Sequence, residues 1–519
     1  MLRASLTALC LVLGCSDPPS PPPTTAADAS PAPTPIDVTA PVSEARPAAP
    51  APTVDAPEQH WLGRVTIPNA PALVVELKFD PDVIAAATLA IPAQKVPPTA
   101  LVDVAISPTS MAFTLPIPGA DDRGQARFTV ALVEGSDTAT GTLVQAGLTM
   151  PLTMRRMAQG ETLAEALRPQ TPKPPFPYAL RDAVYTSADG TTLAGTMTLP
   201  STPGKHPAVV LISGTGEQDR DMTLGDHRFF AVVADHLTRA GIAVLRVDDR
   251  GVGGSGGNTS ETGFDGKVED VVAGMAWLAV QPEIDAARVG LVGHSEGGLI
   301  GPLVAVRARP PAIPVAFLVL LAAPGVPTAE LMITQMDQTL RAQRVSAERL
   351  AVGNAGQQRV LEAVLSGADD AALRVIVTEQ LDAIFALTPD NKPGFLGRRA
   401  QIESALLQVA TPAMRDFIRA EPGPTLAQVR CPVIAMGGTM DLQVDGETNL
   451  AAIRAALERG KNPDITTVLV PGRNHLFQPA AIGTPEEWAS IDTTIDPAVL
   501  AQISDWVRVR AAVDHASAQ

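Results

Sequence analysis

The sequence predicts a small antiparallel all-β domain followed by a larger α/β domain with a mostly parallel sheet and a helical insert. From Trp61 to about Met157, short runs of β-forming residues alternate with turn residues, which is typical of antiparallel strands. After residue 178, continuous apolar runs alternate with helical segments, which indicates parallel strands covered by helices on both faces. From about Thr328 to Leu426 the strand signal stops and helical spacing takes its place.

The N-terminal residues have the composition of an export signal rather than of a fold. Arg3 precedes the short apolar stretch Leu6–Gly14, which is far shorter than the roughly 20 residues of a membrane-spanning helix. This stretch followed by Cys15 resembles the lipobox of bacterial lipoproteins. The resemblance implies a signal peptide over 1–15 that is cut before Cys15, with the lipid carried by Cys15. The alternative is an ordinary signal peptide with an incidental cysteine.

Residues 16–57 are dominated by Pro, Ala, Thr and Ser. Such a segment buries too little apolar surface to offset the entropy of ordering, so we expect a disordered tether. The chain is then expected at the bacterial cell envelope, facing the periplasm or the cell surface, with a lipid anchor in the membrane.

The antiparallel β domain is expected over 58–160. Its clearest strands are Ala72–Phe79, Ser110–Leu115, Ala126–Val133 and Thr140–Val144. The acidic residues fall in turns, and no histidine or cysteine occurs apart from His60 at the edge. The domain therefore carries no catalytic signature. A linker over 161–178 follows, with a short helix at 161–168 and then a Pro-rich stretch.

The α/β catalytic domain is expected over 179–327 and 427–512, interrupted by a helical cap insert at 328–426. Its predicted strands are Ala208–Ile212, Ile242–Val247, Val289–Val292, Val315–Leu321, Val433–Met436 and Thr467–Val470. Its predicted helices are Phe229–Arg239, Val268–Val280, Glu447–Arg459 and Pro497–Ala511. Within the insert, helices are predicted at Leu331–Arg341, Ser346–Val352, Gln357–Leu365, Ala371–Leu387 and Arg398–Val409.

The formal net charge is −16, and no run of Lys or Arg stands out. An acidic surface repels phosphate backbones, so a nucleic-acid partner is not expected. Of the three cysteines, Cys10 would leave with the signal and Cys15 would be lipidated, so no internal disulfide is expected. Cys431 precedes an apolar run and is interpreted as a small hydrophobe rather than a nucleophile.

Gly293-His294-Ser295-Glu296-Gly297 matches the pattern G-x-S-x-G, in which a serine sits between a strand and a helix. Val289–Val292 supplies the strand, and the residues after Gly297 open a helical stretch. A second match, around Ser255, lies in a glycine-rich segment with no helix after it. The context therefore favours Ser295 as the nucleophile.

A serine nucleophile needs a base, and the base needs an orienting acid. His475 is the only histidine between Ser295 and the C-terminal tail, where His515 lies. The acid is expected after the strand Val433–Met436, where Asp441 and Asp445 compete. Asp441 follows the glycine turn directly, whereas Asp445 is placed to cap the next helix. We therefore expect Asp441 to be the acid.

An oxyanion hole needs two preorganised N–H groups. One is expected from Glu296, the residue after the nucleophile. The other is expected from Thr215 or Gly216, in the glycine-rich loop after the strand Ala208–Ile212. The acidic cluster Asp219-Arg220-Asp221 in that loop is interpreted as a salt-bridged brace or, alternatively, as part of substrate recognition.

These motifs together resemble those of a group of bacterial α/β-hydrolase esterases, over about residues 178–510. The segments that carry the resemblance are Ser213–Asp221, Asp248–Gly253, His294–Gly298, Met440–Val444 and Asn474–Gln478. Ile91–Gln94 and Leu148–Leu152 are more weakly similar to an N-terminal β domain found in many relatives. The family often has Asn or Ser near the glycine where this chain has Gly437-Gly438-Thr439. The resemblance implies a carboxylesterase on short acyl esters, with a cap over the active site.

The expected reaction is hydrolysis of a small ester through an acyl-enzyme on Ser295, with His475 as base and Asp441 as its orienting acid. No metal or other cofactor is expected. Fold and triad do not select the acyl group, so a serine peptidase, an aminopeptidase or an acyltransferase is the first alternative. A non-catalytic binding lipoprotein of the cell envelope is the second alternative.

Overall fold

The computed structural model describes residues 58–67, 72–307, 313–387, 399, 402–404 and 406–511. The predicted signal peptide, the lipid site Cys15, the tether and His515 lie outside this range. The described chain divides into two compact units, one made of residues 58–66 and 73–159 and the other essentially of residues 160–511. The architecture, an antiparallel β unit followed by an α/β-hydrolase unit with a mostly parallel sheet, confirms the predicted fold class.

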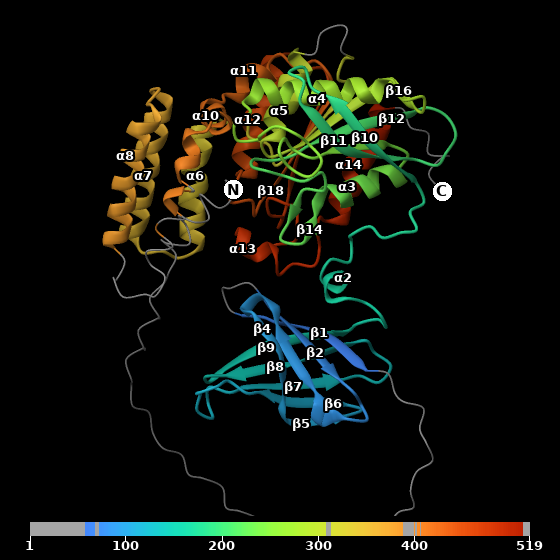
Figure 1. Ribbon diagram of the computed structural model, residues 1–519, viewed down its shortest axis with the longest axis vertical. Coiled ribbons are helices and arrows are strands. Elements are labelled where there is room, and N and C mark those ends of the chain that lie inside the picture. Colours follow the sequence, from blue (N-terminus) through green and yellow to red (C-terminus); the bar gives the residue numbers. More distant parts are fainter. Residues whose placement is uncertain are drawn as a thin grey trace, which may run out of the picture. The chain divides into compact units, whose positions relative to one another are not determined.

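The first unit is a nine-stranded antiparallel sheet in the order β4-β3-β2-β1-β9-β8-β7-β6-β5 (Figure 1). Its edge strands β4 and β5 follow each other in the chain, and the sheet curls around an apolar core that includes Trp61, Leu77, Met111 and Phe128. The strands are β1 Gln59–Val65, β2 Leu73–Phe79, β3 Thr88–Ile91, β4 Val96–Ala100, β5 Val102–Ser107, β6 Ser110–Leu115, β7 Ala126–Leu132, β8 Thr138–Gln145 and β9 Leu148–Arg156.

The second unit begins with the short helix α2, Leu163–Leu167, whose capping box pairs Thr162 with Glu165. Next to it Arg168 is buried and donates to the carbonyl oxygens of Gly225, Ala489 and Ile491. These bonds fix the segment predicted as a linker to the α/β unit that follows it.

The α/β sheet has eight strands in the order β10-β11-β15-β12-β16-β17-β18-β19. All pairings from β15 to β19 in this order are parallel, whereas β11 pairs antiparallel with both β10 and β15. The strands are β10 Ala179–Thr186, β11 Thr192–Leu199, β12 His206–Ile212, β15 Ala243–Val247, β16 Ile284–His294, β17 Leu318–Leu321, β18 Val433–Gly438 and β19 Ile465–Val470. The sequence did not predict the β10–β11 hairpin, because its residues alternate between buried and exposed and lack a continuous apolar run.

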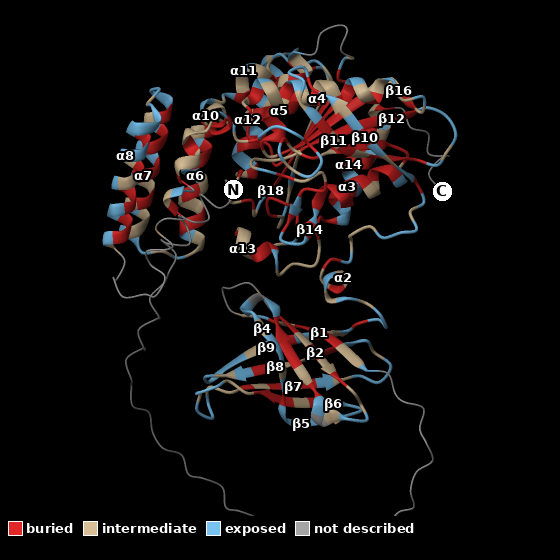
Figure 2. Ribbon diagram, viewed as in Figure 1, coloured by how far each residue is buried: buried red, intermediate tan, exposed pale blue. Residues whose placement is uncertain are grey.

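Helices cover both faces of this sheet, so its central strands are buried throughout (Figure 2). α3 Phe229–Arg239 and α14 Pro497–Arg510 share an apolar cluster with one face. α4 Phe264–Ala279, α5 Gly297–Arg307 and α12 Gly446–Arg459 share the cluster of the other face. The remaining short elements are β13 Thr223–Leu224, β14 His227–Arg228 and α13 Pro485–Trp488.

The helical insert lies between β17 and β18. Its described helices are α6 Thr328–Ala342, α7 Ala347–Leu365, α8 Asp370–Ala386, η3 Leu407–Ala410, α10 Pro412–Arg419 and α11 Pro422–Leu426. The predicted helix Arg398–Val409 falls partly outside the described residues, and its last part is 3-10 helix. Of the helices that the structure describes, none has the length and hydropathy needed to cross a bilayer.

The prediction of two separate helices, Ser346–Val352 and Gln357–Leu365, is wrong, because α7 runs through both. Gly353 and Gly356 lie between the two predicted segments. Gly356 is buried against α8, where a β-carbon would come within 2.5 Å of Gln380 Cγ. The glycine therefore permits close helix packing rather than ending the helix.

Candidate active site

Ser295 sits at a tight turn between β16 and α5. Its φ is +54°, a left-handed conformation that side-chain-bearing residues rarely adopt. A β-carbon at Gly293 would lie 2.1 Å from the carbonyl oxygen of Gly297, so the turn closes only with glycine there. The strand, strained serine and helix form the arrangement that a nucleophile elbow requires.

Ser255, in the second G-x-S-x-G match, has a different environment. Its buried hydroxyl donates to the carbonyl oxygen of Asp248 at 2.8 Å and accepts from the N–H of Ala194 at 2.9 Å. The hydroxyl holds a loop, and no helix begins directly after Ser255, since the next helix, α4, starts only at Phe264.

Asp441 and His475 meet at the carboxyl ends of β18 and β19. Oδ2 of Asp441 lies 2.8 Å from Nδ1 of His475, and both side chains are buried. Oδ1 of Asp441 accepts from the N–H groups of Gln443 at 2.8 Å and Val444 at 2.9 Å. Asp445 instead caps α12, accepting from the N–H of Thr448 at 2.9 Å.

The loop of His475 lies directly against the elbow. Nε2 of His294, the residue before Ser295, is 2.9 Å from the carbonyl oxygen of His475. The two imidazole rings meet edge to face, with centroids 4.7 Å apart. Among the described residues the Ser295 hydroxyl makes no hydrogen bond. Such contacts often tighten only when substrate binds.

The loop after β12 also reaches the elbow. A β-carbon at Gly214 would lie 3.3 Å from Cβ of Ser295, so this loop passes beside the nucleophile. Within the described part of the chain, the N–H groups of Thr215, Gly216 and Glu296 donate to no protein acceptor. Free backbone donors beside a nucleophile are what an oxyanion hole requires.

The family model described as X-Pro dipeptidyl-peptidase (S15 family) matches residues 164–475, more than half of the chain. The chain belongs to the S15 family. The α/β fold and the family match together support a hydrolase enzyme.

Two curated relatives match part of this S15-family chain. Esterase EstD of Thermotoga maritima is 33% identical over 144 residues, which cover 28% of this chain and 33% of the relative. An uncharacterized protein of Mycobacterium tuberculosis is 35% identical over 132 residues, covering 25% of this chain and 43% of the relative. The match therefore spans less than half the length of either relative. Among solved structures, a Pyrococcus furiosus esterase is 16% identical with a TM-score of 0.38, covering 64% of this chain and 91% of that one.

The histidine loop of the S15-family domain is held by buried amides that sequence reasoning gave no role. Oδ1 of Asn474 accepts from the N–H groups of Leu476 and Gln478, both at 3.0 Å. The Gln478 amide in turn donates to the carbonyl oxygen of Thr493 and contacts Nε2 of His227. The sequence feature from which this role could have been predicted is the pair of amides, Asn474 and Gln478, on either side of His475.

The acidic cluster after the oxyanion loop is a structural brace. Asp219 accepts from the N–H and hydroxyl of Thr223. Arg220 forms a two-pronged pair with Asp248, at 3.1 and 2.7 Å. Asp221 is buried between two further arginines, Arg228 and Arg246. These contacts favour the brace interpretation over substrate recognition and leave Glu217 as the exposed carboxylate of this loop.

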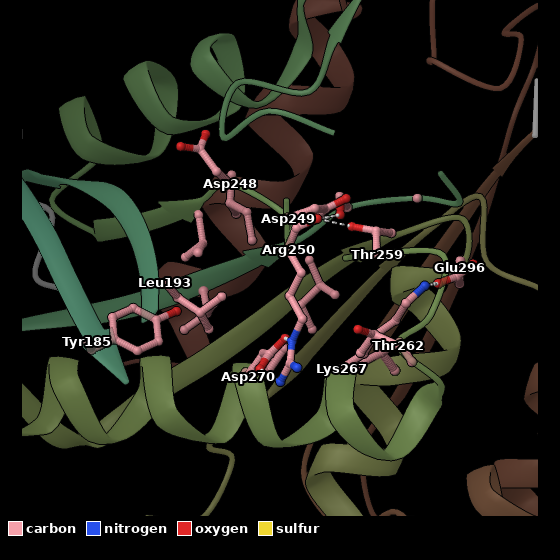
Figure 3. Close-up of a pocket in the computed structure, with 18 residues that line it drawn as sticks. Tyr185, Leu193, Asp248, Asp249, Arg250, Thr259, Thr262, Lys267, Asp270 and Glu296 are labelled. Atoms are coloured by element: carbon pink, nitrogen blue, oxygen red, sulfur yellow. Dashed lines mark hydrogen bonds and ion pairs between the residues drawn. The ribbon is translucent and has the colours of Figure 1, made fainter. Parts of the chain in front are cut away.

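A cavity of about 80 Å³, lined by both apolar and charged side chains, lies on the α4 side of the oxyanion loop (Figure 3). Its wall includes Ser213, Gly214 and Glu296, so the cavity adjoins the turn that carries Ser295. Asp249 lines this cavity and is half-buried, and its carboxyl accepts hydrogen bonds from the Ser213 hydroxyl and the Gln218 N–H. Desolvation there raises the pKa of Asp249 to about 7 against 3.8 for a free carboxyl.

Two further kinds of reactive group bear on the chemistry of the site: the free cysteine Cys431 and clusters of metal-binding side chains. Cys431 is partly buried and packs against the core, and burial raises the pKa of its thiol to about 12. In the portion of the chain that the structure describes, no group of three or more His, Cys, Asp or Glu side chains is arranged to hold a metal ion.

Proposed function

We propose that this hydrolase is a serine carboxylesterase that cleaves short-chain acyl esters with Ser295, His475 and Asp441. The observation that carries the proposal is the buried 2.8 Å contact between Asp441 and His475, on a loop that touches the strained elbow of Ser295. A base with an orienting acid beside a half-buried, strained serine is the arrangement that nucleophilic acyl transfer needs.

In the proposed reaction the Ser295 hydroxyl attacks the ester carbonyl carbon and gives its proton to Nε2 of His475. The carboxylate of Asp441 holds the imidazole and stabilises the imidazolium. The carbonyl oxygen becomes an oxyanion that accepts from Glu296 N–H and from Thr215 or Gly216 N–H. The tetrahedral intermediate collapses, and His475 protonates the departing alcohol. Water then repeats the sequence on the acyl-enzyme, releasing the acid and restoring Ser295.

The S15 match favours one second candidate, a dipeptidyl-peptidase that releases an N-terminal X-Pro unit. Such an enzyme needs an acid to hold the substrate's free amine. Asp219 and Asp221 are already paired within the chain, which leaves Glu217 as the acid of this loop for that task. The relative named as an esterase supports the ester reaction instead.

Two substrates separate these candidates on the same purified protein: p-nitrophenyl butyrate and Ala-Pro-p-nitroanilide. The proposal expects kcat/KM for the ester to exceed that for the anilide, and the reverse order would assign the peptidase. Ser295→Ala should lower kcat by about 10⁴- to 10⁶-fold. Ser255→Ala, in the second G-x-S-x-G match, is the matched control and should keep the activity of the folded protein.

We also propose that the protein is exported and held at the cell envelope by a lipid on Cys15. The support is the apolar stretch Leu6–Gly14 followed by a cysteine and a long Pro- and Ala-rich segment. Radiolabelled palmitate should enter the wild-type protein and not Cys15→Ser, which should leave the membrane fraction. Equal membrane association of both forms would contradict the anchor.

A further inference from the structure

The cavity behind the oxyanion loop holds three ionisable side chains that the proposed reaction does not use. Asp249 follows β15, Lys267 lies in the first turns of α4, and Glu296 follows the nucleophile. Figure 3 shows them around one space, with Lys267 and Glu296 joined by an ion pair. Charged groups taken this far from water are costly unless paired and hydrogen-bonded, so their partners matter.

The carboxylate of Asp249 joins the two ends of the oxyanion loop. Oδ1 accepts from the hydroxyl of Ser213 at 2.7 Å, and Oδ2 accepts from the N–H of Gln218 at 2.9 Å. The N–H of Asp249 returns a bond to the carbonyl oxygen of Gln218 at 3.0 Å. Thr215 and Gly216, the candidate donors, lie between these two attachment points. Among the residues that the structure describes, no other side chain from outside the loop forms hydrogen bonds at both of its ends.

The other half of the oxyanion hole is anchored in the same cavity. Glu296 supplies the N–H after the nucleophile, and its buried carboxylate is bound by the Lys267 ammonium. Lys267 also attracts the Asp249 carboxylate, whereas Glu296 repels it. Both backbone segments that carry the proposed donors are therefore tied, through side chains, to one charged cluster.

Preorganisation is what gives these ties a functional consequence. Donors act on the transition state only if they already point to the place of the oxyanion, and a misplacement of about 1 Å can cost about 10²-fold in rate. The loop between Ser213 and Gln218 has no regular secondary structure of its own. The bonds to Asp249 therefore replace the rigidity that a helix or strand would supply.

We propose that Asp249 is the positioning residue of the oxyanion loop, joining Ser213 to Gln218 so that the Thr215 and Gly216 N–H groups face the acyl oxygen. This inference rests on the proposed serine-esterase function. A neutral side chain of the same shape can do this work: an amide oxygen accepts from Gln218 N–H while the amide nitrogen donates to the Ser213 oxygen. Asparagine should therefore substitute for Asp249, and alanine should not.

The test compares Asp249→Ala, Asp249→Asn and Ser213→Ala in the full chain, with p-nitrophenyl butyrate as substrate. Two inhibitors supply the decisive readout. An alkyl trifluoromethyl ketone reacts with the nucleophilic serine to give a tetrahedral adduct that carries an oxyanion. An ether analogue of the substrate, which cannot react, measures ground-state binding alone. We expect Asp249→Ala to lower kcat/KM and to lower the binding affinity of the trifluoromethyl ketone by the same factor, about 10- to 100-fold. Binding of the ether should not change, and Asp249→Asn should restore both values to within about fivefold of wild type.

Asp270→Asn is the matched control, because it changes a carboxyl of the same cavity that binds Arg250 and not the loop. It should keep the kcat of the folded protein. If Asp249→Ala does not fold, Ser213→Ala takes its place in the test, because it deletes only the 2.7 Å hydrogen bond. This variant should bind the trifluoromethyl ketone several-fold more weakly and should bind the ether as wild type does.

Unchanged ketone affinity in the folded variants, or equal weakening of ketone and ether, would overturn the positioning role. Loss of activity in Asp249→Asn equal to that in Asp249→Ala would also overturn it. An active Ser295→Ala protein would instead overturn the proposed function itself, so the two failures are distinguishable.

Discussion

Asp441→Asn is expected to reduce kcat by about 10⁴-fold without disturbing the fold. Oδ1 of Asp441 accepts from two backbone N–H groups, at 2.8 and 2.9 Å, whereas Oδ2 faces Nδ1 of His475 at 2.8 Å. An asparagine must keep its oxygen toward the two backbone donors, since its NH₂ group cannot accept from them. The NH₂ group then faces the imidazole.

That orientation forces the wrong tautomer on His475. An NH₂ group donates, so Nδ1 becomes the acceptor and the ring proton stays on Nε2, the atom that must take the Ser295 proton. A loss of about 10⁴-fold corresponds to about 5.5 kcal/mol of transition-state stabilisation, at 1.36 kcal/mol per factor of ten. The two backbone N–H groups and the imidazole nitrogen all keep a hydrogen-bond partner in Asp441→Asn, so stability should change much less than activity.

The assay is steady-state hydrolysis of p-nitrophenyl butyrate, with thermal melting to confirm the fold. Asp445→Asn is the control: asparagine caps a helix about as well as aspartate, so both kcat and melting temperature should stay near wild type. A folded Asp441→Asn protein within about tenfold of wild-type kcat would refute the assignment of the acid. So would an equal loss in Asp445→Asn.

Three further outcomes are expected. Gly293→Ala should abolish activity and lower the melting temperature, because the new β-carbon would lie 2.1 Å from the Gly297 carbonyl oxygen. Gly301→Ala is the control, because its β-carbon would meet nothing closer than 3.6 Å, and it should keep both activity and melting temperature. Equal behaviour of the two variants would contradict the elbow geometry. The free energy of unfolding should fall as pH rises from about 4 to about 7, because folded Asp249 keeps a proton that the unfolded chain has lost. Urea titrations at several pH values should show this fall and should show a smaller fall in Asp249→Asn. The same pH dependence in Asp249→Asn and wild type would argue against the raised pKa of Asp249. Native protein at pH 8 should resist modification by iodoacetamide at Cys431, and unfolded protein should react there; rapid native labelling would contradict the raised thiol pKa.

The sequence predicted those parts of the fold that depend on local pattern and chain order. Continuous apolar runs identified the buried parallel strands, and strand-then-helix context separated Ser295 from Ser255. The competition between Asp441 and Asp445 could be judged because helix capping gives Asp445 a role of its own, which its bond to Thr448 bears out.

What the sequence did not predict depends on contacts between distant segments. The β10–β11 hairpin alternates between buried and exposed residues and gives only a weak signal beside the continuous strands. The continuity of α7 depends on Gln380 of α8, which lies against Gly356. The tie from Asp249 to Ser213 spans 36 positions of sequence, and no local period marks such a pair.

The central claim, an activated serine at position 295, is tested most directly by labelling the purified protein with a fluorophosphonate probe and mapping the modified peptide. The account predicts one modified residue, Ser295, with labelling lost in His475→Ala and retained in Ser255→Ala. Labelling at another serine, or labelling at Ser295 that does not depend on His475, would contradict it.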